Sequence, residues 1–138
     1  MCIFTIIFFK NFHLQKTHTK RNNTTMDKTT KYEAMILDMI NHMEGIKYSN
    51  EPKLETKLII DKEKRRYMVV TVGWNEAGDY HHSCSIHVEI INEKLWFYTN
   101  MTDIDFGRKL VYQGVPPSDI VVGFLTPKMR EVSDYAVA

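Results

Sequence analysis

Residues 80–91 constrain the fold of this chain more than any other segment, because apolar and polar side chains alternate along them. Such alternation indicates a β-strand with one face toward a core, since successive side chains in a strand point to opposite faces. The pattern therefore predicts a strand from Tyr80 to Ile91. One face is expected to carry His82, Cys84, Ile86, Val88 and Ile90, and the other His81, Ser83, Ser85, His87 and Glu89.

Three further segments have strand character and flank this one along the chain. They are residues 54–60, where the alternation is approximate, residues 67–74, which are rich in β-branched and aromatic side chains, and residues 94–99. The stretches between them, at residues 61–66, 75–79 and 92–93, carry charged or turn-forming residues. Because strands joined by such short turns pair antiparallel, the sequence predicts a four-stranded antiparallel meander.

Helices are predicted on both sides of this meander. Thr30 and Glu33 form a capping-box pattern, and apolar residues then recur at helical spacing as far as Gly45, which predicts a helix over about residues 31–44. Thr102 is expected to cap a second helix over about residues 103–113.

The end of the chain completes the predicted fold. The apolar run at residues 120–125 is typical of a buried strand, and Thr126 followed by proline predicts a short helix over about residues 127–132. The predicted fold class is therefore α+β. Its elements in order are an N-terminal helix, the four-stranded meander, a helix, a fifth strand and a short C-terminal helix.

Residues 1–25 differ from the rest of the chain in their charge. They hold four of the 18 basic residues and none of the 17 acidic ones, so 14 basic and 17 acidic residues remain in residues 26–138. Their charge follows the apolar start, which is the reverse of a signal peptide. We expect residues 1–25 to be a leader outside the domain, through a mis-assigned start or disorder, and residues 26–138 to be one domain.

Composition also limits location and partners. No apolar run approaches the roughly 20 residues that span a bilayer, so no membrane association is expected. The two cysteines, Cys2 and Cys84, do not make a disulfide framework, which favours the reducing cytoplasm. The near-neutral charge of residues 26–138 counts against binding DNA alone, because phosphate contacts need a basic surface.

Residues that could carry chemistry cluster in the strand at residues 80–91. Its three histidines, Cys84 and Glu89 include metal-ligand types, but alternation divides them between two faces. Ser83 or Ser85 with His87 could form a nucleophile and base, yet no nucleophile-elbow motif surrounds them. We therefore assign no catalytic, cofactor-binding or metal-binding residues, and we expect a protein that is not an enzyme. A small metal protein centred on His87 and Glu89 remains an alternative.

Aromatic side chains gather at Trp74 and at residues 96–98. Such a group could stack the bases of a single-stranded nucleic acid, but the basic groove that accompanies a stacking platform is missing. Packing inside the fold or burial at a protein interface is the favoured interpretation.

The chain from Met26 onward resembles the XisI family. The segments that carry the resemblance are Val72-Gly73-Trp74, His82 to Ile90, Lys94-Leu95-Trp96, Gly114-Val115-Pro116, Asp119 to Phe124, Pro127 to Arg130, and Tyr135 to Ala138. They occur in the family's order and cover nearly all of residues 26–138. The departures are Ser83 for glycine, Ser85 for an apolar residue, Glu89 for aspartate and Tyr135 for phenylalanine.

The resemblance implies an accessory role in DNA recombination. XisI proteins are described as controlling factors for excision of the fdxN element in filamentous nitrogen-fixing cyanobacteria, where they act with XisH, a nuclease-like protein. We therefore expect a XisH-like partner, with DNA reached through that partner. A regulator that restrains a XisH-like nuclease and a directionality factor that binds DNA directly are the alternatives. Candidate interface residues are Trp74, His87, Glu89, Trp96, Arg130 and Tyr135. The aromatic strand and the apolar tail at residues 135–138 also suggest a homodimer.

Overall fold

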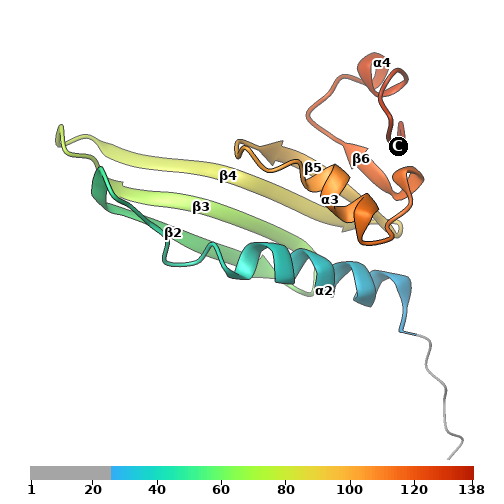
Figure 1. The fold of residues 1–138 in the computed structure, drawn as a ribbon, viewed down its shortest axis with the longest axis horizontal. Helices are drawn as coiled ribbons and strands as arrows, with labels where there is room; N and C mark the ends of the chain where they lie inside the picture. The colour runs from blue at the N-terminus through green and yellow to red at the C-terminus, as the bar shows by residue number, and fades with distance from the viewer. Residues whose placement is uncertain (1–25) are drawn as a thin grey trace, which may run out of the picture.

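The computed structural model describes residues 26–138, and the predicted leader at residues 1–25 lies outside them. A six-stranded sheet forms the body of the fold, and the longest helix lies along one of its faces (Figure 1). The strands are β1 (Lys47–Tyr48), β2 (Glu51–Asp61), β3 (Arg66–Trp74), β4 (Tyr80–Ile91), β5 (Lys94–Asn100) and β6 (Ile120–Val122). The helices are α2 (Lys28–Asn41), α3 (Phe106–Tyr112), the 3₁₀ turn η1 (Pro117–Asp119) and α4 (Pro127–Arg130).

The spatial order of the strands follows the chain, from β1 to β6. The first five strands pair antiparallel, whereas β6 lies parallel to β5. The α+β class is confirmed, but the meander has five strands instead of the predicted four. The added strand, β1, has only two residues, which is too short for a period-two pattern to appear in the sequence.

Two helices, α2 and α3, begin at positions other than those predicted, whereas α4 begins where predicted. Asp27, not Thr30, stands at the N-cap of α2, so the capping-box prediction was wrong. The second helix, α3, begins at Phe106, with the Asp105 side chain accepting a hydrogen bond from the Arg108 amide, whereas Thr102 instead bonds Asn100. Thr126 caps α4 as predicted, because its hydroxyl oxygen accepts from the Met129 amide at 3.3 Å.

Two β-bulges change the side-chain pattern that simple alternation predicted. In β4, Cys84 lies opposite Val70 and Ile86 lies opposite Val69, so Ser85 is the extra residue between them. Because Val69 and Val70 point to opposite faces, Cys84 and Ile86 also point to opposite faces. The prediction that these two share a face was therefore wrong.

The bulge also corrects the placement of the histidines. His81 pairs with Gly73 and shares the core face with Val88, whereas His82 and His87 pair with Val72 and Met68 on the opposite face. His81 is thus separated from His87 and Glu89, with which it was predicted to align. In β5, Tyr98 is the extra residue of a second bulge, since Phe97 lies opposite Val88 and Thr99 opposite His87.

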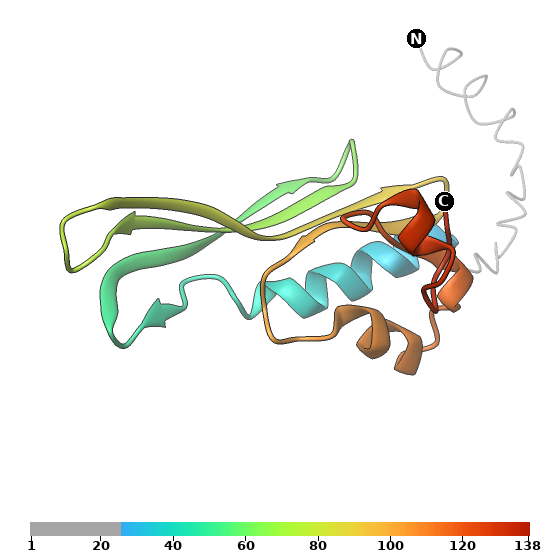
Figure 2. The ribbon, with the colours of Figure 1, turned by 90° about the horizontal axis from the view of Figure 1, so that it is seen from above.

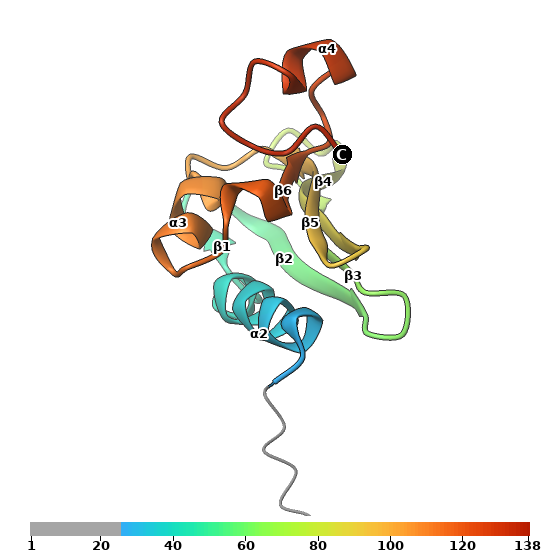
Figure 3. The same cartoon turned by 90° about the vertical axis from the view of Figure 1, so that its right-hand side faces the viewer.

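The core lies between the sheet and α2, with α3 on the same side (Figure 3). From α2, Ile36, Met39 and Ile40 are almost fully buried, as is Tyr67 of β3. The apolar stripe of this helix therefore packs on the sheet, as its spacing indicated. Burying a side chain of this kind contributes roughly 1.5–3 kcal/mol of apolar transfer free energy.

A hydrogen-bonded group ties the start of α2 to the turn before β6. The Tyr32 hydroxyl donates to the Asp119 carboxylate at 2.5 Å, and the Lys28 ammonium lies 2.8 Å from the same oxygen, Oδ2. Burial alone would raise the pKa of Asp119, but the hydrogen bonds from Lys28 and Tyr32 outweigh burial and lower it. The group therefore favours a charged Asp119 beneath the helix.

We expect Asp119→Asn to lower the free energy of unfolding by about 1–3 kcal/mol at pH 7, because it removes the charge that Lys28 and Tyr32 bind. Since the folded pKa is lowered, this stabilisation is fully present above the ordinary aspartate pKa of about 3.9 and is lost as the pH falls through the folded value. Urea unfolding at several pH values measures the difference from the wild type, which should narrow below about pH 4.

The matched control is Asp103→Asn, which changes an exposed carboxylate. Its unfolding free energy should follow the wild type at every pH. A deficit in Asp119→Asn that stays constant from pH 7 to pH 3 would contradict the role assigned to the charged form.

Candidate partner-binding surface

The face of the sheet opposite α2 carries a continuous row of aromatic and charged side chains. Among the described residues, α2 and α3 both lie on the core face, and α4 lies beyond the β6 edge (Figure 3). We call the row on the other face the aromatic ladder. It consists of Arg66 on β3, His87 and Glu89 on β4, Trp96 and Tyr98 on β5, and Arg130 at the end of α4.

Three rings form the middle of the aromatic ladder. The Trp96 and Tyr98 ring centroids are 6.2 Å apart with an interplanar angle of 25°, a stacked arrangement. The His87 and Tyr98 centroids are 5.1 Å apart at 41°. Trp96 and Tyr98 are two residues apart on β5, so both side chains point to the face that carries His87. Tyr98 remains 36% exposed, so its ring is available to a partner.

A carboxylate closes one end of the aromatic ladder. Oε1 of Glu89 lies 3.1 Å from His87 Nε2 and 3.2 Å from Arg66 Nε. Because a carboxylate oxygen only accepts, His87 must carry a proton on Nε2 to make this bond. Glu89 therefore fixes the orientation of the imidazole ring and compensates the Arg66 charge.

Arg130 closes the other end. Its guanidinium carbon lies 5.4 Å from the centroid of the Trp96 ring, within the range of a cation–π contact. The same side chain donates to the carbonyl oxygens of Leu125 and Val137, both at 3.0 Å, and of Gly123 at 3.5 Å. Arg130 thus holds the C-terminal segment against the sheet and supports the Trp96 ring.

The structure brings four of the six candidate interface residues together. His87, Glu89, Trp96 and Arg130 all belong to the aromatic ladder, whereas Trp74 lies at the far end of β3. There its ring meets Tyr80 edge-on, with centroids 5.3 Å apart, and both side chains are more than half exposed.

Tyr135 belongs to a different environment. Its ring packs so closely against α3 that a Cβ added at Gly107 would lie 2.5 Å from the Tyr135 hydroxyl. Burial raises the pKa of this hydroxyl. Tyr135 therefore anchors the tail on α3 and does not extend the aromatic ladder.

Sequence reasoning did not assign Tyr98 and Arg66 to the candidate surface. The aromatic run at residues 96–98 was treated as one group and was not divided by face, although period two places Tyr98 with Trp96. In the sequence, Arg66 was grouped with the charged turn at residues 61–66. The structure shows that it is the first residue of β3 and pairs with Glu89.

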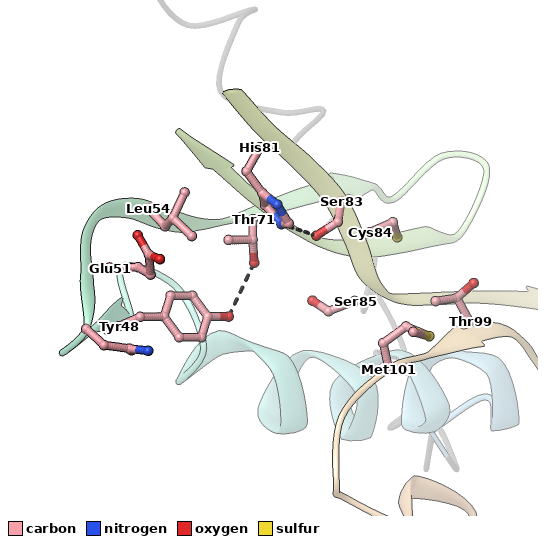
Figure 4. Close-up of a pocket in the computed structure, with 11 residues that line it drawn as sticks. Tyr48, Glu51, Leu54, Thr71, His81, Ser83, Cys84, Ser85, Thr99 and Met101 are labelled. Atoms are coloured by element: carbon pink, nitrogen blue, oxygen red, sulfur yellow. Dashed lines mark hydrogen bonds between the residues drawn. The ribbon is translucent and has the colours of Figure 1, made fainter. Parts of the chain in front are cut away.

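A groove of about 680 Å³ lies on another part of the molecule and is lined from β4 by His81, Ser83 and Ser85 (Figure 4). Ser83 bonds His81 at 2.9 Å, not His87 as the sequence suggested, and the Ser85 hydroxyl donates to the Val69 carbonyl. Glu51, which also lines the groove, accepts from the Glu76 amide. Among the described residues this carboxylate makes no hydrogen bond to His81, as the acid of a catalytic triad does to orient its histidine.

Cys84 lies at the same groove, and its thiol donates to the Ile86 carbonyl. Burial raises the pKa of this thiol, which disfavours the thiolate needed for nucleophilic attack or metal binding. Within residues 26–138, no three histidine, cysteine, aspartate or glutamate side chains gather closely enough to hold a metal ion. The described helices are also too short and polar to cross a membrane.

Comparison with known proteins gives the family of the chain. The family model described as XisI protein matches residues 26–137. The chain belongs to the XisI family. The match starts at the residue where the charge balance of the sequence changes. No curated protein sequence matches the chain significantly.

Two solved structures of XisI proteins are similar to this one. The crystal structure of a XisI-like protein from Anabaena variabilis ATCC 29413 has a TM-score of 0.71 and 32% identity, and the match covers 80% of this chain and 99% of that chain. The crystal structure of the fdxN element excision controlling factor XisI from the same organism has a TM-score of 0.70 and 26% identity. That match covers 81% of this chain and 100% of that chain. The chain therefore spans essentially the full length of both proteins.

We expect Arg130→Lys to lower the free energy of unfolding of this XisI-family protein by about 1–3 kcal/mol. A lysine ammonium cannot replace the planar guanidinium, whose nitrogens donate to three backbone carbonyls at once. Urea unfolding followed by tryptophan fluorescence measures the loss and the exposure of Trp96 together. Lys128→Arg, in the same short helix and exposed, is the control and should match the wild type. An unchanged midpoint for Arg130→Lys would show that its carbonyl contacts contribute no net stability.

Proposed function

We propose that this protein is a non-catalytic controlling factor that binds a XisH-like, nuclease-type protein through the aromatic ladder. In this role it regulates the partner during excision of a DNA element, and contacts DNA through the partner. The observation that carries the proposal is the exposed, pre-ordered ring of Tyr98 between His87 and Trp96 on a sheet face without a covering helix among the described residues.

Family membership supports the controlling role. A similar solved structure carries the name fdxN element excision controlling factor, and the family is the same. The XisH-like partner is proposed from the family resemblance of the sequence, and we assign its binding to the surface described above.

The chemistry of the aromatic ladder favours a protein partner over a nucleic acid. Tyrosine, tryptophan and arginine are the residues most enriched at the centres of protein interfaces. Both arginines of the ladder already have partners, Arg66 the Glu89 carboxylate and Arg130 backbone carbonyls, and the Glu89 charge offsets that of Arg66. Residues 26–138 also carry more acidic than basic side chains.

We expect Tyr98→Ala to weaken binding of a XisH-like partner by about 30-fold, corresponding to the loss of a central interface residue. Calorimetry of the two purified proteins measures the dissociation constant. The matched control is Tyr112→Ala on α3, because Tyr112 is 93% exposed but lies on an element of the core face. Because Tyr98→Ala also removes the stacking on His87 and Trp96, circular dichroism must show that both variants are folded at the temperature of the binding measurement.

Three outcomes would contradict the proposal. They are the absence of a complex at micromolar concentration, equal binding by Tyr98→Ala and wild type, and an equal loss in the Tyr112→Ala control. A gel-shift titration of the isolated protein distinguishes the direct DNA-binding alternative, which requires affinity that falls steeply as salt rises. Nuclease assays of the partner with and without this protein distinguish activation from restraint.

A further inference from the structure

The outer edge of the sheet is only partly covered. β1 pairs with β2 at two positions, Lys47 with Glu55 and Tyr48 with Glu51. Beyond Thr56, β2 continues to Asp61 as the edge of the sheet, with β3 on its other side. An edge of this kind offers backbone donors and acceptors to another strand.

The direction of these backbone groups follows from Thr56. Its amide donates to the Ile46 carbonyl at 3.3 Å, and its carbonyl accepts from the Gly45 amide at 2.9 Å, so both point outward. Groups of every second residue in an antiparallel strand point the same way, and no bulge interrupts the register of β2 with β3. The amide and carbonyl groups of Leu58 and Ile60 therefore also point outward.

The side chains on this edge are apolar in the centre and oppositely charged at the ends. Ile59 is 50% exposed and Ile60 is 38% exposed, which is unusual for two consecutive isoleucines. Lys57 stands two residues before Ile59, and Asp61 stands two residues after it. The hairpin that joins β2 to β3 projects away from α2 (Figure 2), which leaves this part of the edge accessible.

We propose that a second copy of this chain binds here, pairing its β2 antiparallel to the first and extending the sheet across a two-fold axis at Ile59. In that register Leu58 lies opposite Ile60 of the partner subunit, and the outward backbone groups of both form four hydrogen bonds. Lys57 lies opposite Asp61 of the partner subunit, and the symmetry repeats this pair. The edge is thus complementary to itself, as an isologous interface requires.

Neighbouring registers lack this complementarity. An axis at Leu58 would oppose Glu55 to Asp61 of the partner subunit, two like charges. An axis at Ile60 would oppose Ile59 to Asp61 of the partner subunit, an apolar side chain to a charge. The axis at Ile59 is therefore selected by charge and polarity. The paired residues lie on the outer edge of β2, whereas the rings of the aromatic ladder lie on β4 and β5, so the dimer can be tested without the proposed partner.

Charge exchange tests the register. In Lys57→Glu two acidic side chains face each other, and in Asp61→Lys two basic ones do, so each variant should raise the dimer dissociation constant about tenfold. An equimolar mixture of the two variants should recover dimers, because positions 57 and 61 then carry opposite charges at both contacts of the mixed dimer. Sedimentation velocity of the full chain measures the fraction of dimer in each single variant and in their mixture. Lys109→Glu on α3 is the control for net charge and should match the wild type.

A disulfide tests the position of the axis. Residues at the axis have Cα atoms about 4.5 Å apart, within the range of a disulfide, so Ile59→Cys should form a covalent dimer under oxidation. The matched control is Ile60→Cys, since residue 60 would face Leu58 of the partner subunit and not its own copy. A wild-type sample controls for Cys2 and Cys84.

The results of these two experiments decide whether the proposed dimer interface exists. A covalent dimer from Ile59→Cys but not from Ile60→Cys or wild type, with recovery in the charge-exchange mixture, supports the interface. A wild type that is monomeric at all concentrations, an equal yield of both cysteine dimers, or no recovery in the mixture overturns it.

Discussion

The two β-bulges decide which side chains this sheet presents on each face. Without the extra residue at Ser85, Cys84 would join Ile86 in the core, and His81 would share the face of His87. Without the one at Tyr98, Thr99 would no longer lie opposite His87. A bulge leaves only one residue unpaired, but every side chain beyond it then points to the opposite face of the sheet. The bulge at Ser85 therefore decides which side chains of the first half of β4 face the core, whereas the aromatic ladder follows the regular alternation of residues 87, 89, 96 and 98.

Much of the fold could be predicted because its strands are long and regular. The bounds of β4 were predicted to the residue, and those of β3 and β5 to within one, since their flanking turns are strong signals. β1 was too short to predict. The start of α2 was missed because the tertiary contact of Lys28 and Tyr32 with Asp119 extends the helix beyond the local capping pattern.

The candidate surface was predicted less completely, for physical reasons. The association of His87 with Glu89 follows from period two and was visible in the sequence. The contact of Arg130 with Trp96 joins residues distant in the chain, and only the folded structure shows it. Tyr135 was predicted to be an interface residue, yet its ring packs against α3 in the space that Gly107 leaves. Residue type alone indicated which side chains could bind a partner. Only tertiary packing shows which of them anchor the fold, as Tyr135 does, and which remain exposed.

The bond between Tyr32 and Asp119 also has a consequence for the order of folding. It joins residues 87 positions apart, whereas each hairpin of the meander closes over a short turn. Local pairings form before distant ones, because a long loop must lose more entropy before its contacts repay the cost. The meander can therefore assemble first and present its apolar face, on which the N-terminal helix and the parallel strand then meet. In kinetic terms, the first described helix of the chain belongs to the last step of folding.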